Sequence, residues 1–184
     1  MKHHEHHLLS GISVFVLLFS SFSNCQNAAS TQQKANDEQN IREVVIRQQM
    51  EEWIKNGDKN EAEAKDKSEK AIAKMLNFRI FFVSVNGKDP SDDFINKFRD
   101  LPRDIKKVSA SEISKEWRLA VIDRSSHQRG IRFSADEIRW LGPDSVEVQG
   151  GYHCDGLCGA GIKFRVQREN GHWVIKGSRM EWIS

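Results

Sequence analysis

The chain has 184 residues, is 38% hydrophobic and carries a formal net charge of +2, with both signs mixed along its length. That length suits a single domain, and the charge pattern excludes the dense basic tract of a nucleic-acid-binding surface. The chain also lacks a Walker-type loop, a dinucleotide fingerprint, Gly-x-Ser-x-Gly and His-Glu-x-x-His. We therefore predict no nucleic-acid partner, no cofactor, no metal and no catalytic residues.

The first 25 residues have the layout of a secretory signal. A short titratable head precedes an apolar run at residues 8–19, and a small, polar exit follows. The run is shorter than the roughly 20 apolar residues of a membrane-spanning helix. A buried helix of the folded domain is the alternative, but the polar stretch that follows argues against it. The head contains four histidines, which we assign to the signal rather than to a metal site: His3, His4, His6 and His7.

Cys25 lies where such a signal ends. The preceding "FSNC" resembles a bacterial lipoprotein box, in which the cysteine is lipidated and becomes the mature N-terminus. Phe22 and Asn24 depart from that box, so ordinary cleavage near Cys25 is the alternative. Two acyl chains, at about 0.8 kcal/mol per buried CH₂, would hold the protein firmly on a membrane. We expect an exported protein of the cell envelope, with the membrane as its partner through this anchor.

Residues 26–38 are small and polar without apolar periodicity, which is typical of a flexible tether. Residues 39–184 then form one predicted domain. Its first helix is "IREVVIRQQMEEWI", which we expect to end at "NGD", residues 56–58. A second helix is predicted over residues 60–76. The apolar residues expected to be buried in it are Ala71, Ile72, Met75 and Leu76.

"FRIFFVSV" is rich in aromatic and β-branched residues and predicts a strand that ends at "NGK". "DPSDDFINKFRDL" predicts a short helix with Asp89 as its N-cap and Pro90 in the first turn. The buried stripe of this helix should be Phe94, Ile95, Phe98 and Leu101.

From residue 106 onward the apolar pattern has period two. Strands are predicted at residues 106–109, 119–123, 131–141, 146–154, 162–167 and 172–183. The parity of apolar positions changes between Ala135 and Ile138, which indicates a bulge near residues 136–137. The connections between the last strands are too short for crossovers, so these strands should form an antiparallel meander.

Helices followed by a curved antiparallel sheet predict the α+β class. This order of elements resembles the NTF2-like and cystatin-like folds, in which a sheet wraps around helices. The stretches "NGKDPSDDFINKF", "SVEVQGGYHC" and "RENGHWVIKGSRMEWIS" resemble an uncharacterised group of exported bacterial proteins. The resemblance covers roughly the last hundred residues and implies neither an activity nor an active site.

"YHCDGLCGAG" holds two of the three cysteines, Cys154 and Cys158, on either side of a predicted turn. In an oxidising compartment, facing residues of a hairpin lie within disulfide range, so we predict a disulfide. A redox pair would need a stabilised thiolate. A metal site would recruit His153 and Asp155, but His153 points to the other face of the strand. Unpaired thiols are the remaining alternative.

Three other groups of residues are candidates for a functional role. His127 follows Asp123 and two serines, Ser125 and Ser126, which suits a solvated turn better than an acid–base pair. The five tryptophans favour a core role, but Trp140 and Tyr152 are our candidates to line a pocket. Arg139, Arg165 and Arg179 could form an anion site, although pairing with strand glutamates is the simpler interpretation.

Three hypotheses of function follow. The leading one is a non-enzymatic, envelope-tethered binding or accessory domain that takes an unknown protein or a small apolar ligand. The second is a small NTF2-like enzyme with a pocket between helices and sheet. The third is a thiol or metal protein that uses the loop with Cys154 and Cys158.

Overall fold

The computed structural model describes residues 15–116 and 118–184, with side chains from residue 30 onward. Internal contacts divide the chain into two units, Met1–Asp37 and Glu38–Ser184. The head of the expected signal and the first part of its apolar run lie outside the described residues. Cys25 lies in helix α1 (Phe15–Glu63), where the structure describes its backbone but not its side chain. Within the described residues, no helix is both long and apolar enough to cross a membrane.

The segment 26–38, which the sequence predicted to be a flexible tether, is helical within α1. Side-chain amides bridge successive turns there, with Gln32 Nε2 donating to Asn36 Oδ1 at 3.0 Å and Gln33 Nε2 to Asp37 Oδ1 at 3.3 Å. Pairs four residues apart support a helix, and alanine and glutamine cost little in one. A low apolar content therefore did not prevent helix formation.

Helix α1 continues through "NGD", where we expected it to end. A Cβ on Gly57 would lie 2.6 Å from Asn77 Oδ1, so this glycine allows the Asn77 side chain to lie close against the helix. Asn77 Nδ2 donates to Asp58 Oδ1 at 3.0 Å and to Glu61 Oε2 at 2.8 Å. Gly57 therefore allows two segments of the chain to approach closely and does not mark the end of a helix.

Helix α2 (Lys67–Leu76) begins at Asp66, whose carboxylate accepts from the Ser68 and Glu69 amides. The predicted burial of its apolar residues was wrong. Ala73 is the buried residue of this helix, whereas Ile72, Met75 and Leu76 are 46–55% exposed. At 100° per residue, Ala73 lies on the opposite side of the helix axis from Met75, so only one narrow stripe of this short helix meets the body.

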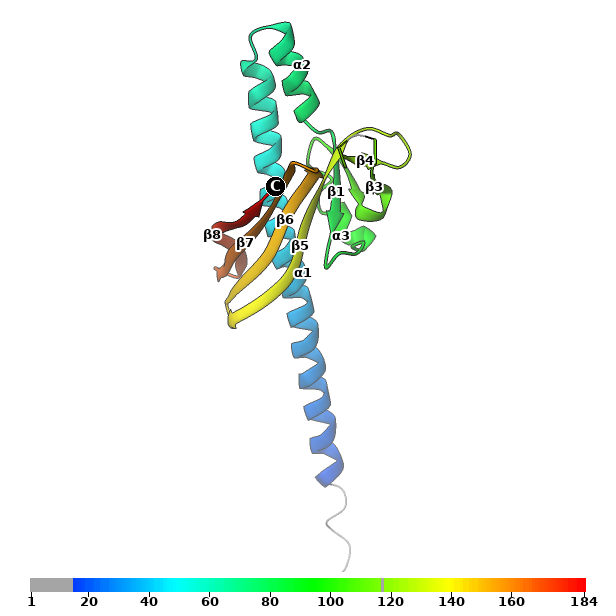
Figure 1. The fold of residues 1–184 in the computed structure, drawn as a ribbon. Helices are drawn as coiled ribbons and strands as arrows, with labels where there is room; N and C mark the ends of the chain where they lie inside the picture. Colours follow the sequence, from blue (N-terminus) through cyan, green and yellow to red (C-terminus); the bar gives the residue numbers. More distant parts are fainter. Residues whose placement is uncertain (1–14, 117) are drawn as a thin grey trace, which may run out of the picture. The chain divides into compact units, whose positions relative to one another are not determined.

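The main sheet has six strands in the order β2-β1-β5-β6-β7-β8 (Figure 1). Strands β5 to β8 form the expected antiparallel meander. Strand β1 runs parallel to both β2 and β5, so the sheet is mixed and not wholly antiparallel as predicted. The bounds are β1 Ile80–Ser84, β2 Asp104–Lys107, β5 Gly130–Gly142, β6 Ser145–Asp155, β7 Cys158–Glu169 and β8 His172–Ile183.

The predicted bulge in β5 is confirmed, because the register with β6 shifts between Ala135 and Ile138. The part of α1 that follows residue 37 lies along one face of the sheet (Figure 1), and buried apolar side chains form a dense core between the two. The segment of α1 around Val45 and Met50 supplies the helical side of that core. The sheet supplies the other side with Phe81, Ile131, Phe133, Val146, Val148, Phe164 and Val166. The fold class is therefore α+β.

A second, two-stranded sheet lies beside β1. It pairs β3 (Ser111–Ile113) with β4 (Val121–Asp123), and a short 3-10 helix, η1 (Val108–Ala110), leads into it. Val121 packs against Ile80 and Phe82 of β1. This small apolar cluster is separate from the core under α1.

Helix α3 (Asp92–Asn96) starts two residues later than predicted. Its N-cap is Ser91, whose Oγ accepts from the Phe94 amide at 3.2 Å. Asp89, the expected cap, instead accepts from the Ser109 amide at 2.8 Å. Phe94 and Phe98 are buried as predicted.

Candidate functional site

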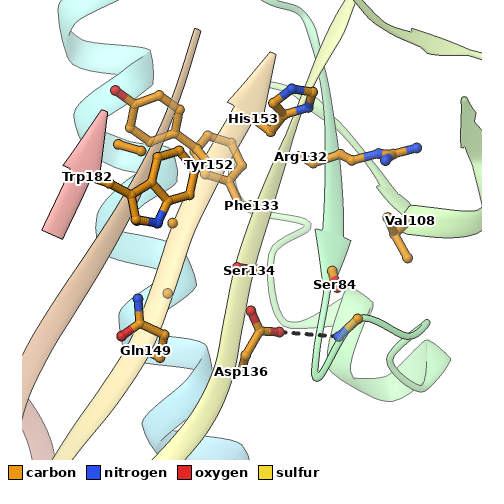
Figure 2. A pocket seen from close by; sticks show the side chains of 15 residues that line it. Ser84, Val108, Arg132, Phe133, Ser134, Asp136, Gln149, Tyr152, His153 and Trp182 are labelled. Carbon is orange, nitrogen blue, oxygen red and sulfur yellow. Dashed lines mark hydrogen bonds between the residues drawn. The ribbon is translucent and has the colours of Figure 1, made fainter. Parts of the chain in front are cut away.

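The face of the sheet opposite α1 carries a groove of about 450 Å³ (Figure 2). It crosses the strands, with contributions from β1, β5, β6, β7 and β8. The loop after β1 and the helix η1 close its far end. The labelled residues in Figure 2 that line it are Ser84, Val108, Arg132, Phe133, Ser134, Asp136, Gln149, Tyr152, His153 and Trp182. Two of them, Phe133 and Tyr152, have their rings packed on the α1 side of the sheet.

One row of small residues forms the floor of the groove. Ser84 pairs with Ser134, Ser134 with Gly151, and Gly151 with Gly161 across four neighbouring strands. The row ends at Trp182 on β8, which pairs with Gly161. Because side chains in one row of a sheet project to the same face, small residues in this row leave the face hollow.

Trp182 closes the groove at the C-terminal strand. A Cβ on Gly161 would lie only 2.1 Å from Trp182 Nε1 and 2.6 Å from Cε2, so the indole lies across the glycine. Trp182 as a whole is nevertheless 54% exposed. Because Gly161 has no side chain, the indole of Trp182 can lie flat against the sheet at the rim of the groove.

Arg132 and His153 form one wall. They are opposite each other on β5 and β6, and Arg132 Nε donates to Ser111 Oγ at 2.8 Å. Burial lowers the pKa of His153, and the positive charge of Arg132 lowers it further, while Asp155 opposes both effects. His153 is therefore neutral at pH 7, and the guanidinium carries the positive charge of this wall.

Asp136 and Gln149 form the opposite wall. Asp136 lies in the bulge of β5, and its Oδ1 accepts from the Gly87 amide at 3.2 Å, as the dashed line in Figure 2 shows. A carboxylate has about four acceptor positions, so one hydrogen bond leaves it able to accept others. Arg132 and Asp136 are four residues apart on one strand, or about 13 Å. The groove thus carries charges of opposite sign on its two walls.

Our two candidates for pocket lining take different places. Tyr152 is among the residues that line the groove, and its ring meets Trp53 of α1 edge-on at 5.1 Å between centroids. Trp140 is not among the lining residues. It packs edge-on against Trp173 at 5.7 Å, next to the core.

Cys154 and Cys158 lie at disulfide distance, with their Cα atoms 5.2 Å apart, as the sequence predicted. The expected register was wrong in detail. Asp155 pairs with Cys158 and His153 with Gly159, so Cys154 occupies a bulge and is fully buried. The bulge brings the two cysteines together although they do not face each other in the ladder. Within the described part of the chain, no three His, Cys, Asp or Glu side chains are grouped to hold a metal ion.

The segment with His127 is a turn organised by Asp123. This carboxylate is 1% exposed and accepts from Lys106 Nζ at 2.8 Å and from the backbone and hydroxyl groups of Ser125 and Ser126. Hydrogen bonds from Lys106 and Ser125 hold the Asp123 pKa far below its usual range. His127 contributes its backbone amide, which donates to the Asp123 carbonyl at 2.9 Å. These contacts favour a structural role for Asp123, which stabilises the turn, over a role in proton transfer.

The strand arginines have glutamate neighbours. Arg139 pairs with Glu147, and Arg179 lies 3.4 Å from Glu181. Arg165 is directly opposite Glu147 in the register of β6 and β7. This arrangement matches charged pairs on a sheet face more closely than a common anion site.

Sequence reasoning missed Ser84, Ser134 and Asp136 as members of one site. Their positions on the outer face follow from strand periodicity, but their alignment depends on the parallel pairing of β1 with β5. The parity change in β5 was the one available signal, because it located the bulge that contains Asp136. No protein-family model, no curated protein and no solved structure matches this chain.

Proposed function

We propose that the protein is a non-enzymatic binding or accessory domain of the bacterial envelope whose ligand lies in the groove. The observation that carries this proposal is the groove itself. Its volume of about 450 Å³ lies within the usual range of roughly 300–1,000 Å³ for ligand sites. Its walls supply hydrogen-bonding groups of several kinds, which favours a polar ligand over the small apolar one suggested by the sequence.

The arrangement of titratable groups favours binding over catalysis. His153 lies opposite Arg132, about 13 Å along the strands from Asp136, so these groups cannot share a proton. A small enzyme of the NTF2-like kind would place its pocket between helix and sheet. In the described part of the chain, buried side chains such as Val45 and Phe133 fill that layer.

The finer fold assignment is part of the proposal. A helix that packs on a four-stranded antiparallel meander is the arrangement expected of NTF2-like and cystatin-like domains, and α1 with β5 to β8 has it. In this view, the parallel strands β1 and β2 and the small sheet are additions at one edge. The groove lies partly on these additions.

The envelope location rests on the signal-like N-terminus and on Cys25. Expression of the full chain in a bacterium should place it in the membrane fraction, with a mature N-terminus at a diacylated Cys25 by mass spectrometry. Cys25→Ser should move it to the soluble fraction. Intact protein with Met1 and free thiols in the cytosol would contradict the export proposal.

Binding can be tested with the full chain against four ligand classes: oligosaccharides, short peptides, fatty acids and nucleotides. We expect one class to raise the unfolding temperature of the wild-type protein and not that of Ser134→Leu, which fills the floor of the groove. Leu141→Ala, at an exposed position of the same strand, is the control and should respond like wild type. If no class gives a shift that Ser134→Leu removes, the proposed function is wrong.

A further inference from the structure

We infer that the ligand of the groove is a short oligosaccharide, a chain of linked sugar rings. This inference rests on the proposed function and names the ligand class for the same site. Three features carry it: a flat aromatic surface at one end, polar groups of mixed kind along both walls, and a floor that runs across the sheet (Figure 2).

The aromatic surface is the indole of Trp182. Contact with Gly161 keeps the ring flat on the sheet, so the part that stays exposed is preorganised. A pyranose ring has one face made of C–H groups, and such a face stacks on the electron-rich face of an indole. An indole held by a glycine loses little conformational freedom when a ligand stacks on it.

The walls suit hydroxyl groups. A sugar hydroxyl is both a donor and an acceptor, so one hydroxyl of the ligand can donate to the Asp136 carboxylate while another accepts from the Arg132 guanidinium. The serine hydroxyls of Ser84 and Ser134 lie between these walls and can do either. A ligand with many hydroxyl groups can satisfy all of them, whereas a purely apolar ligand would leave them buried and unpaired.

The length of the groove favours several linked rings. From β1 to β8 there are four strand spacings, or about 19 Å. That span is longer than one sugar ring. Trp182 would stack one ring at the C-terminal end, and the wall with Asp136 would meet the neighbouring part of the chain.

An extended peptide fits the groove less well. Peptides that join a sheet pair with the unpaired backbone of an edge strand. The floor strands β5, β6 and β7 are paired on both sides, so their backbone groups already take part in the ladder. A nucleotide would need a cluster of positive charges, but the Asp136 carboxylate opposes the Arg132 guanidinium here.

The groove should hold the saccharide without cleaving it. Hydrolysis of a glycosidic bond normally uses two carboxyl groups, one on each side of the scissile bond. Among the described residues that line the groove, Asp136 is the one carboxylate. The neutral His153 on the opposite wall can accept or donate a hydrogen bond to the ligand.

The test measures binding to the purified full-length chain by calorimetry and by tryptophan fluorescence, in a detergent without sugar headgroups. The probes are chitotetraose, maltotetraose, tetraalanine and inorganic phosphate. We expect at least one tetrasaccharide to bind and to change the fluorescence. Trp182→Ala should weaken that binding by roughly tenfold or more.

Met180→Ala is the matched control. Met180 and Trp182 are on the same strand and are equally exposed at 54%, but Met180 pairs with Ile162 and does not line the groove. This variant should bind like wild type. Asp136→Asn should also weaken binding, which distinguishes the groove from stacking at the indole alone.

Tetrasaccharide binding that Trp182→Ala and Asp136→Asn leave unchanged would overturn the inference, as would the absence of saccharide binding. If tetraalanine or phosphate binds instead and Ser134→Leu abolishes it, the saccharide inference fails and the proposed binding function stands. If nothing binds in the groove, both fail.

Discussion

The two faces of the main sheet are built from alternating residues of the same strands and differ in almost every respect. On the face under α1, Phe133 and Phe164 are at most 3% exposed and fill the core. On the other face, Ser134 and Gly161 form the hollow floor of the groove. Stability accounts for the first face. The need for stability does not explain why serines and glycines form a row that leads to an exposed indole. The second face is therefore the candidate for function.

The sharpest test of this contrast compares neighbouring residues on β5. Phe133→Ala should lower the free energy of unfolding by about 3–5 kcal/mol, because it leaves a cavity in the core. Ser134→Ala, one residue later, should change it by less than about 1 kcal/mol, because a groove-floor hydroxyl has little packing to lose. Urea unfolding measures both. Similar losses for the two variants would mean that the faces are not distinct.

The next largest effect should come from Asp123, which is buried outside the core. Asp123→Ala should cost about 2–3 kcal/mol, because it removes charge-assisted hydrogen bonds to Lys106 and the two serines. Because the Asp123 pKa is lowered in the folded state, it adds stability at pH values above the unfolded pKa of 3.8. This contribution is lost as the pH falls through the folded pKa. The variant should therefore lose less stability than wild type on acidification.

Asp104→Asn is the control for that experiment, because Asp104 shares Lys106 but is largely exposed. We expect it to cost less than about 1 kcal/mol. Equal effects of the two variants would show that the buried position of Asp123 is not what matters.

The disulfide should contribute less. Reduction, or replacement of Cys154 and Cys158 by serine, should lower stability by about 2 kcal/mol for so short a loop. Non-reducing mass spectrometry should find the protein two hydrogens lighter than its reduced form, with no effect of a chelator. Reversible reduction under mild conditions, or a mass that changes with chelator, would favour a thiol or metal role for this loop.

Gly161 tests the contact that shapes the outer face. Gly161→Ala should cost about 1 kcal/mol, at the low end for overpacking because the indole of Trp182 can swing outward. Most of that cost should disappear in a Trp182→Ala background, where the new methyl group has no ring to meet. Chemical denaturation of the four variants measures the coupling, and additive effects would contradict the contact.

The smallest effect should be the pH response of His153. Its pKa is lowered in the folded state, so the unfolded chain binds the proton more readily. The contribution of His153 to the free energy of unfolding should therefore be fully present above the unfolded pKa of 6.5. It should be lost as the pH falls from there through the lower folded pKa. His153→Gln should flatten this decline in thermal unfolding between pH 7 and pH 5. His172→Gln, at an exposed histidine, should leave it unchanged.

Local periodicity predicted several parts of the fold correctly. The parity change in β5 located the bulge, the apolar stripe of the predicted short helix identified Phe94 and Phe98 as buried, and the short connections predicted the meander. In each case the signal lies within a few neighbouring residues, because the pattern of apolar side chains reports which face must be buried.

The errors share a different cause. Gly57 did not end a helix, Asp89 did not cap one, and Ile72 is exposed, because distant segments decide each of these outcomes. Asn77 lies close against Gly57, the Ser109 amide donates to the Asp89 carboxylate, and Ala73 is the residue of α2 that is buried. Propensities of single residues do not contain these partners.

The sequence by itself determined the α+β class, the meander and the pairing of the last two cysteines, since each depends on spacing along the chain. Only the tertiary structure decided that β1 lies parallel to β5 and that one row runs from Ser84 to Trp182. Such a row is set by the register between five strands, and register is a long-range property that no single strand encodes.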